Sequence, residues 1–349
     1  MTRSVPMSLA VGVVLALAGA GGGCGGDSSG SPEARATSSV KAQIASELDN
    51  LVASATALRA AAPAPDADGW SLATDMAAVS AMRTQWKATR VAYERVEGAI
   101  AVLFPNYDVS TDERYDGFIA EAPDANLFDG EGVTGVHAIE RILWAGEHPP
   151  AVVAFEASLV GYEPASFPMT MAQATEFRDG LATRLVTDAQ AMRDMFKPLA
   201  LDAASAFRGV IGSIAEQVEK VTLASTGEEE SRYAQHTLGD MRANLEGGRK
   251  TYDSFRTWVR STPGGTGLDA DIMAGFGRVE VLYQGVTGDA LPPVPDGFDP
   301  TAPTAAQLAT PYGVIFAGLS AESNPDDPNS LVTKMAAAAD LIGIPELPE

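Results

Sequence analysis

Apolar residues in this chain recur at steps of three, four or seven over long stretches, and segments rich in proline and glycine separate those stretches. The stretch from Trp70 to Phe104 shows this spacing most clearly, with one apolar face formed by Leu72, Met76, Val79, Trp86, Tyr93, Ile100 and Leu103. Such spacing gathers side chains on one side of an α-helix, whereas a half-buried β-strand needs strict alternation. Alternating β-branched runs are few. The pattern therefore predicts an all-α protein.

Breaker segments divide the remaining chain into further predicted helices. These cover residues 40–62, 133–145, 169–197, 201–225, 228–260, 268–286, 305–319 and 330–342. Long helices joined by short breaks favour packed bundles. We expect one helical domain over residues 40–345, made of two bundles of roughly 40–165 and 166–345, a layout that a weak internal repeat would fit. The acidic residues 228–230 would open a helix, where negative charge suits the helix dipole.

The first residues have the composition of an export signal. Residues 7–18 form an apolar run too short to span a bilayer, and a glycine run then leads to Cys24. This order is typical of a bacterial lipoprotein signal peptide over residues 1–23, cut before a lipidated Cys24. The alternative is an ordinary signal peptide cut at an alanine further upstream. Residues 24–39 are predicted to be a flexible tether. Both interpretations place the mature protein in the cell envelope or periplasm, and the first anchors it to a membrane.

The charge of the chain limits its partners. Asp and Glu together number 46 and Lys and Arg 24, which gives a net charge of −22. A surface this acidic repels nucleic acid and attracts cations, although the acidity could also serve solubility alone. A single cysteine cannot form an internal disulfide or a thiolate zinc site, and the chain has only three histidines. A metal site would therefore depend on carboxylates, which favour hard or borderline ions.

Two glutamates interrupt the apolar face of the clearest helix. Glu94 and Glu97 are three residues apart, so they are neighbours on a helix, and Glu97 falls between Tyr93 and Ile100. A carboxylate directed inward is costly unless a cation or a hydrogen-bond donor meets it. Glu97 is therefore a candidate metal ligand together with Glu94. The alternative is a glutamate at the edge of the face that reaches solvent or pairs with an arginine.

A second pair has the same spacing. His137 and Glu140 share one helix face, which Val133 and Trp144 extend. An imidazole and a carboxylate at this spacing hold metals in the cores of helical bundles, and they suit iron, zinc, manganese or copper. The alternative is a buried histidine that is hydrogen-bonded to its own helix neighbour.

A third donor is predicted between the two pairs. Residues 108–116 form an acidic stretch that we expect to be a loop, and Asp112 is its best-placed carboxylate. The predicted core site is then one nitrogen and several oxygens around a single ion. Without a cation, carboxylates this close would raise one another's pKa.

Four stretches resemble the imelysin-like family, in its EfeM/EfeO-type branch of iron-uptake lipoproteins. They are RVAYERVEGAIAVLF (90–104), STDERYDG (110–117), GVHAIERILWAG with the GxHxxE pattern (135–146), and the second-half segment 227–256. The resemblance implies two related four-helix bundles. It also implies the metal ligands His137, Glu140, Glu94, Glu97 and Asp112. One extra residue precedes Asp112 here, and the second-half segment departs from the family pattern around His236 and Asp240, where a structural polar cluster is the simpler expectation.

The resemblance implies a binding protein that captures a divalent or trivalent metal ion, iron first. Its partners would be a membrane iron permease and a haem peroxidase-type protein of an EfeUOB-like uptake system. An imelysin-type metallopeptidase is an alternative, but the chain lacks the HExxH pattern of well-understood zinc peptidases, so an enzyme is the less favoured interpretation. A metal-assisted polysaccharide-binding module and a purely structural envelope protein complete the alternatives.

Overall fold

The computed structural model describes residues 30–346, and over that range it contains helices and no strand. The predicted all-α fold is confirmed. No helix in this range combines the length and the apolar composition needed to cross a membrane. The helices of the first half are α1 Pro32–Ala61, α2 Leu72–Glu94, α3 Glu97–Leu103, α4 Pro105–Asp112, α5 Tyr115–Glu121, α6 Gly135–Leu143 and α7 Pro150–Glu156. The second half contains α8 Met171–Glu176, a π-helical turn Phe177–Leu181, α9 Ala182–Phe196, α10 Ala203–Ala224, α11 Thr237–Ser261, α12 Gly265–Gln284, α13 Ala305–Leu308, α14 Pro311–Glu322 and α15 Leu331–Leu341.

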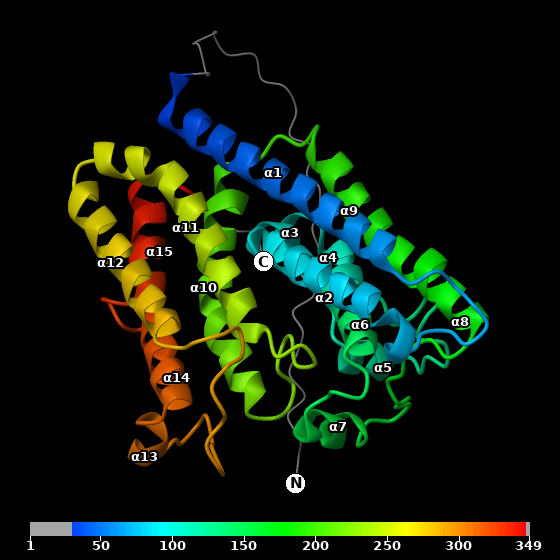
Figure 1. The fold of residues 1–349 in the computed structure, drawn as a ribbon. Coiled ribbons are helices and arrows are strands. Elements are labelled where there is room, and N and C mark those ends of the chain that lie inside the picture. Colours follow the sequence, from blue (N-terminus) through cyan, green and yellow to red (C-terminus); the bar gives the residue numbers. More distant parts are fainter. Residues whose placement is uncertain (1–29, 347–349) are drawn as a thin grey trace.

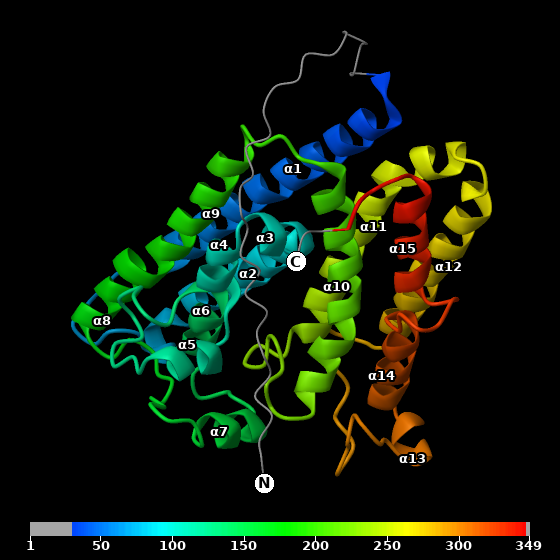
Figure 2. The same cartoon turned by 180° about the vertical axis from the view of Figure 1, so that it is seen from behind.

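Helix α1 connects the two sides of the molecule. It runs across the top of Figure 1 and packs against α2 and α9 on one side and against α11 on the other. Helices α10, α11, α12, α14 and α15 lie on one side of the molecule, away from α8 and α9, and the view from behind in Figure 2 shows the same division. The short helix α3 packs against both α2 and α10, α4 packs against α3, α6 and α9, and α6 also packs against α2.

Two apolar cores match this arrangement. One contains aromatic residues such as Trp70, Trp86 and Phe177, and the other contains Phe207 and Phe255 with many aliphatic neighbours. Each fully buried side chain of this size contributes about 1.5–3 kcal/mol relative to exposure. Residues of α1 as far as Val52 belong to one core, and Ala55 and Leu58 in its last turns belong to the other. The predicted bundle boundary at residues 165 and 166 stays a prediction.

Helix α1 begins inside the segment that was predicted to be a flexible tether. The side chain of Ser31 accepts a hydrogen bond from the amide of Ala34, and Pro32 occupies the first turn, where its missing amide hydrogen costs nothing. Ala36 and Val40 are then buried. The tether prediction for 24–39 is therefore wrong from Pro32 onward, because a capping serine and apolar spacing outweigh the polar composition. Cys24 and the predicted signal peptide lie outside the described residues.

The clearest predicted helix is in fact two helices. Helix α2 ends at Glu94, a turn follows at Arg95 and Val96, and α3 starts at Glu97. Val96 has φ −129° and ψ 0°, and its amide bonds the carbonyl of Tyr93 at 2.9 Å, a tighter turn than the α-helix makes. The apolar spacing continues across this turn, so the pattern alone conceals it. The two glutamates nevertheless stay on the same side of the chain.

Most of the acidic stretch 108–116 is helical, which corrects the loop prediction. Residues 108–112 belong to α4, residues 115 and 116 begin α5, and residues 113 and 114 between them are not helical. Pro105 ends α3 but is also the first residue of α4, and Asp112 is the last. The hydroxyl of Tyr93 donates a hydrogen bond to Asp108, which ties α4 to α2. The charged composition of the segment suggests a loop, but a proline at a first turn favours a helix start, and here the proline prevails.

The acidic residues 228–230 do not begin a helix, which is a further correction. Residues 228 and 229 are irregular, residues 230–235 form turns, and α11 starts only at Thr237. The side chain of Thr237 accepts a hydrogen bond from the amide of Ser231, and the Ser231 hydroxyl donates to Asp240. These side-chain bonds close the turn segment onto the start of the helix, which places the acidic residues beside α2 and α4 instead of at the end of α11.

Helix α6 depends on the glycine of the GxHxxE motif. Gly135 has φ +84°, and a Cβ at this position would collide with the carbonyl oxygen of Thr111 on α4. Glycine is the residue that adopts this positive φ readily and has no Cβ to collide with Thr111. The indole of Trp86 on α2 donates to the carbonyl of Val136 at 2.8 Å. These contacts fix α6, and with it His137, against α2 and α4.

Gly135→Ala is predicted to destabilise the protein more than Gly146→Ala does. Both glycines have φ +84°, but nothing lies within 4 Å of a Cβ at Gly146. We expect the free energy of unfolding to fall by roughly 1 kcal/mol in Gly146→Ala, because of the backbone conformation alone. In Gly135→Ala it should fall by roughly a further 1–3 kcal/mol, because the new Cβ overlaps Thr111. Urea denaturation of both variants measures the difference. Equal losses would show that the approach of α6 to Thr111 is not tight.

Candidate metal centre

A buried arginine organises the polar cluster between α2, α4 and α11. The guanidinium of Arg90 is fully buried and pairs with Glu94 on its own helix and with Asp112 at the end of α4. Its Nη2 also lies 3.2 Å from Glu230 Oε1, and its Nε lies 3.4 Å from Asp240 Oδ1. One side chain thus holds together carboxylates from four separate segments of the chain.

A buried lysine from α10 completes the cluster. Lys220 Nζ lies 3.1 Å from Glu94 Oε2, 3.0 Å from Glu97 Oε1 and 3.4 Å from Glu230 Oε1. The amide of Asn244 on α11 donates a hydrogen bond to Glu97. The five carboxylates around Arg90 and Lys220 therefore outnumber these two permanent cations, so the charge of the cluster favours the binding of a further cation.

The imidazole of His137 faces the same point. Its side chain is buried, and Nε2 lies 3.4 Å from Asp112 Oδ1 and 3.8 Å from Glu230 Oε1 without making a hydrogen bond. Donor atoms of Asp112, His137 and Glu230 all lie within 4.8 Å of one another, as do oxygens of Glu94, Glu97, Asp112 and Glu230. Two overlapping donor groups thus share Asp112 and Glu230.

Glu140, the fifth predicted ligand, does not face this point. Its Oε2 lies 2.8 Å from His137 Nδ1, on the far side of the imidazole from the cluster. Its Oε1 accepts hydrogen bonds from the amides of Tyr233 and Ala234 at 2.9 and 2.7 Å. A carboxylate in this position orients the imidazole and directs Nε2 outward, which is the usual arrangement behind a histidine ligand. The structure therefore brings four of the five predicted residues together and places Glu140 behind one of them.

The cluster changes the proton affinity of its members in opposite directions. Burial and the Arg90 guanidinium each lower the pKa of His137, but three carboxylates close to the ring outweigh them and raise this pKa well above its usual value. Burial would raise the pKa of Glu230, yet the ammonium of Lys220 and then His137 hold it well below its usual range. Glu230 is therefore an ionised carboxylate at the meeting point of all three positive groups.

Two other carboxyl groups retain protons more strongly. Burial, followed by the charge of Glu94, raises the pKa of Glu97 well above its usual value. Burial raises the pKa of Asp240 to about 8, although Arg90 opposes the shift. Bound protons thus relieve part of the negative excess, as expected for carboxylates that share a site.

A hollow of about 230 Å³ leads from solvent to the cluster. Helices α4 and α10 line it with acidic side chains, among them Asp108, Glu216 and Glu219, and Glu97, Lys220 and Glu230 lie at its inner end. Burial raises the pKa of Asp108 to about 7 even though Tyr93 donates a hydrogen bond to it. Negative charge along such a hollow raises the local concentration of cations.

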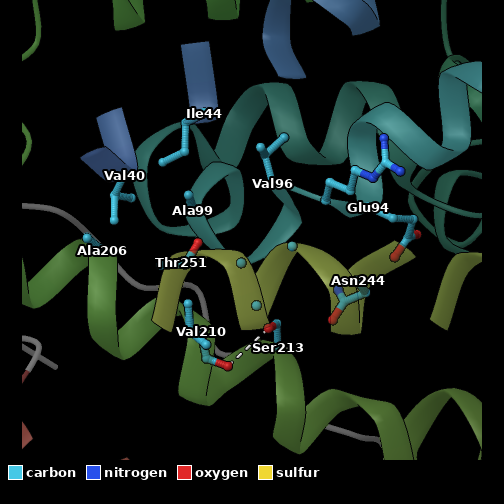
Figure 3. A pocket seen from close by; sticks show the side chains of 14 residues that line it. Val40, Ile44, Glu94, Val96, Ala99, Ala206, Val210, Ser213, Asn244 and Thr251 are labelled. Carbon is cyan, nitrogen blue, oxygen red and sulfur yellow. Dashed lines mark hydrogen bonds between the residues drawn. The ribbon is translucent and has the colours of Figure 1, made fainter. Parts of the chain in front are cut away.

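Apolar side chains back the cluster on another side. Figure 3 shows Glu94 and Asn244 at one end of a small hollow of about 20 Å³, with Val40, Ile44 and Ala206 at the other. Helices α1, α3, α10 and α11 contribute this wall. The low polarity behind Glu94 strengthens its interaction with any cation in front of it.

Three members of the cluster were not predicted as site residues. Glu230 and Lys220 were missed, and Asp240 was assigned to a structural polar cluster, although it also pairs with Arg90. Lys220 carried a signal, because it interrupts the buried face that includes Ile214, Gln217 and Val221 on α10. Glu230 carried none, because residues 228–230 lie in a turn whose direction only the tertiary structure defines.

His236 stands apart from the metal-ligand candidates. Its Nδ1 lies 3.2 Å from Asp289 Oδ2, its Nε2 lies 3.9 Å from Asp240 Oδ1, and the ring packs edge-on against Trp86. Burial, followed by the charge of Lys87, lowers the pKa of His236 to about 4. The residue is thus held neutral in the folded protein, as a packed structural side chain.

The fold and the cluster together define an all-helical protein with an imidazole and several carboxylates converging in its interior. The chain matches the model of the family described as imelysin, Peptidase_M75, over residues 36–308. It therefore belongs to the imelysin family. The four motif stretches that suggested this family all lie within the matched range.

Curated relatives match a shorter part of the chain. The iron uptake system component EfeO of Escherichia coli (strain K12) and that of Shigella flexneri are each 27% identical to it over 194 residues. The match covers 56% of this chain and 41% of each relative, so the chain spans about two fifths of the length of these relatives.

His236→Gln is predicted to flatten the acid dependence of stability. The unfolded pKa of histidine is about 6.5 and the folded pKa of His236 is about 4, so the unfolded state binds more protons between these values. The stability that the neutral His236 contributes is therefore complete above about pH 6.5. It is lost progressively as the pH falls from about 6.5 through about 4. Relative to the variant, the wild type should lose on the order of 3 kcal/mol over this window. Parallel curves in urea denaturation at pH 4 to 7 would contradict the assignment.

Proposed function

We propose that this protein binds a metal ion, iron first, and delivers it to a membrane uptake system from the outer side of the cytoplasmic membrane. The ligands would be His137, Asp112 and Glu230, with Glu94 and Glu97 as neighbouring oxygen donors. The observation that carries the proposal is the buried His137 Nε2, which makes no hydrogen bond and is directed at two carboxylates.

The chemistry of the donors supports iron and related ions. One imidazole with several carboxylates suits borderline divalent ions and Fe³⁺ better than soft ions such as Cu⁺. The acidic hollow gives a cation a route from solvent. The names of the EfeO relatives connect similar chains with iron uptake. Ions such as manganese, zinc and copper remain competitors for the same donors.

The role proposed for Glu140 is to orient His137 and not to bind the ion. Metal-ligating histidines are commonly held in this way by a carboxylate on the other ring nitrogen, and the loss of such a partner typically costs ten- to hundredfold in metal affinity. The HxxE spacing would thus encode one ligand and its support, and the second carboxylate ligand would come from Glu230, beyond the middle of the chain.

We further propose that the mature protein is exported and anchored through a lipid on Cys24. Its partners would be a membrane iron permease and a haem peroxidase-type protein of an EfeUOB-like system. A tethered binding protein at the membrane would keep its cargo near the permease. The apolar run at residues 7–18 and the glycine run before Cys24 support this proposal.

Metal titration of the full-length protein tests the ligand assignment. We expect micromolar or tighter binding of Fe²⁺ under anaerobic conditions, a loss of roughly ten- to hundredfold in affinity for Glu140→Gln, and a larger loss for the ligand variants His137→Ala and Glu230→Gln. The control is Glu322→Gln, a buried carboxylate paired with Arg278 outside the cluster, which should bind as the wild type does. Isothermal titration calorimetry with Fe²⁺, Mn²⁺ and Zn²⁺ provides the measurement. A folded wild type that binds none of these ions would defeat the proposal.

Cys24→Ser tests the anchor. The wild type should sediment with membranes and carry the added mass of acyl chains, whereas the variant should appear in the soluble fraction without that mass. Fractionation of cells and mass spectrometry of the mature protein provide the two measurements. A wild type that is soluble and unacylated would instead support the ordinary signal peptide.

A further inference from the structure

The ammonium of Lys220 lies among the same carboxylates that are proposed to surround the metal ion. Its side chain is 6% exposed, and its ammonium lies 3.0–3.4 Å from oxygens of Glu94, Glu97 and Glu230. These three residues also belong to the group of four carboxylates whose oxygens lie within 4.8 Å of one another. The ammonium is thus already placed against the atoms that are proposed to meet the metal.

Helix packing places Lys220 there. Gly98 on α3 and Gly209 on α10 face each other so closely that a Cβ on either would collide with the carbonyl oxygen of the other. The close contact brings α10 against α3, the helix that carries Glu97 at its first position. Lys220 then points from α10 across to the end of α2. Lys220 lies eleven residues after Gly209 on the same helix and is buried, so its position is not a chance conformation of a surface side chain.

An ammonium and a metal ion compete for these carboxylates. A bound metal lies about 2.0–2.2 Å from carboxylate oxygens, so Lys220 in its present position would be within a few ångströms of it. Two positive charges at that separation in a buried site repel each other strongly, and the shared oxygens cannot serve both fully. Binding of the metal at Glu94 and Glu97 therefore requires the ammonium to move.

The hollow gives the ammonium a place to go. Lys220 lines its inner end, and Glu216, one helical turn earlier on α10, lines the same hollow. Residues four apart on a helix are neighbours, and a lysine side chain has a flexible stem with four carbons. Rotation about the stem would take the ammonium from the cluster to Glu216 without any movement of α10.

We propose that Lys220 is a tethered cation that competes with the metal, holding the carboxylates together when no ion is bound and lowering the affinity for the ion. This inference rests on the proposed function and refines it. A delivery protein must release its cargo, and an internal ammonium that returns to the carboxylates assists release. The competing explanation is that Lys220 only balances the charge of the buried glutamates as a fixed structural element.

The test compares Lys220→Met with the wild type and with Lys334→Met, a control lysine that pairs with Asp271 on the other side of the molecule. Each full-length protein is titrated with Mn²⁺ alone by isothermal titration calorimetry, and folding is followed by circular dichroism. We expect Lys220→Met to bind Mn²⁺ at least tenfold more tightly than the wild type and to melt at a lower temperature without metal. Lys334→Met should bind as the wild type does. Equal or weaker binding by folded Lys220→Met would overturn the inference and leave the proposed function intact.

A second measurement uses the wild type, so it does not depend on the folding of a variant. Acetic anhydride modifies exposed lysine amines, and peptide mass spectrometry follows the rate at Lys220 with and without Mn²⁺. We expect slow modification of the metal-free protein and at least fivefold faster modification when Mn²⁺ is bound, with no change at Lys334. An unchanged rate at Lys220 while Mn²⁺ is bound would overturn the inference.

The two proposals fail in different ways. If the wild type binds no Mn²⁺, Fe²⁺ or Zn²⁺ but Lys220→Met binds Mn²⁺, the ammonium blocks the site as inferred and the proposed metal-binding function is wrong. If neither protein binds any of these ions while both are folded, both proposals fall. Tighter binding by the variant together with a metal-dependent rise in the reactivity of Lys220 supports both.

Discussion

The buried guanidinium of Arg90 is the contact on which the cluster depends. It pairs with carboxylates from α2, from the end of α4, from the turn before α11 and from α11 itself. Removal of one partner from a buried ion network is costly because the remaining charges lose their compensation. The packing of α4 and α11 against α2 and the electrostatics of the candidate metal centre therefore cannot be separated. A fold that places these helices together also concentrates negative charge at one point.

Much of the fold can be predicted from spacing because long amphipathic helices leave a strong periodic signal. Local breaks are harder, as the turn at Arg95 and Val96 demonstrates, since the apolar pattern remains in phase across it. Composition misled in two places: a charged stretch proved to be α4, and an acidic triplet proved to be a turn ahead of α11. In both cases a proline or a side-chain hydrogen bond outweighed the average character of the segment.

The residues of the candidate site also differ in how far the sequence alone could predict them. Glu94, Glu97, Asp112 and His137 were accessible from the sequence because they interrupt apolar faces or lie between such interruptions. Glu230 was not, because its approach to the cluster depends on a contact with Arg90 across more than a hundred residues. Lys220 interrupts a buried face of α10, but the sequence does not show that this face meets Glu94, more than a hundred residues away. The role of Glu140 could not be assigned from spacing either. A carboxylate three residues after a histidine can reach the same ion or the other ring nitrogen, and only the amides of Tyr233 and Ala234 decide between these positions.

The facing glycines of α3 and α10 have a consequence for how such a site can diverge. A contact between two backbones contains no side chain that could be enlarged, trimmed or repacked in small steps. The main chain itself therefore sets the gap between α3 and α10 at this contact, which lies about three helical turns before Lys220 on α10. Variation among related proteins can alter which groups project into that gap far more readily than it can alter the gap. Differences in ion preference should accordingly arise by exchange of donor residues on a rigid frame.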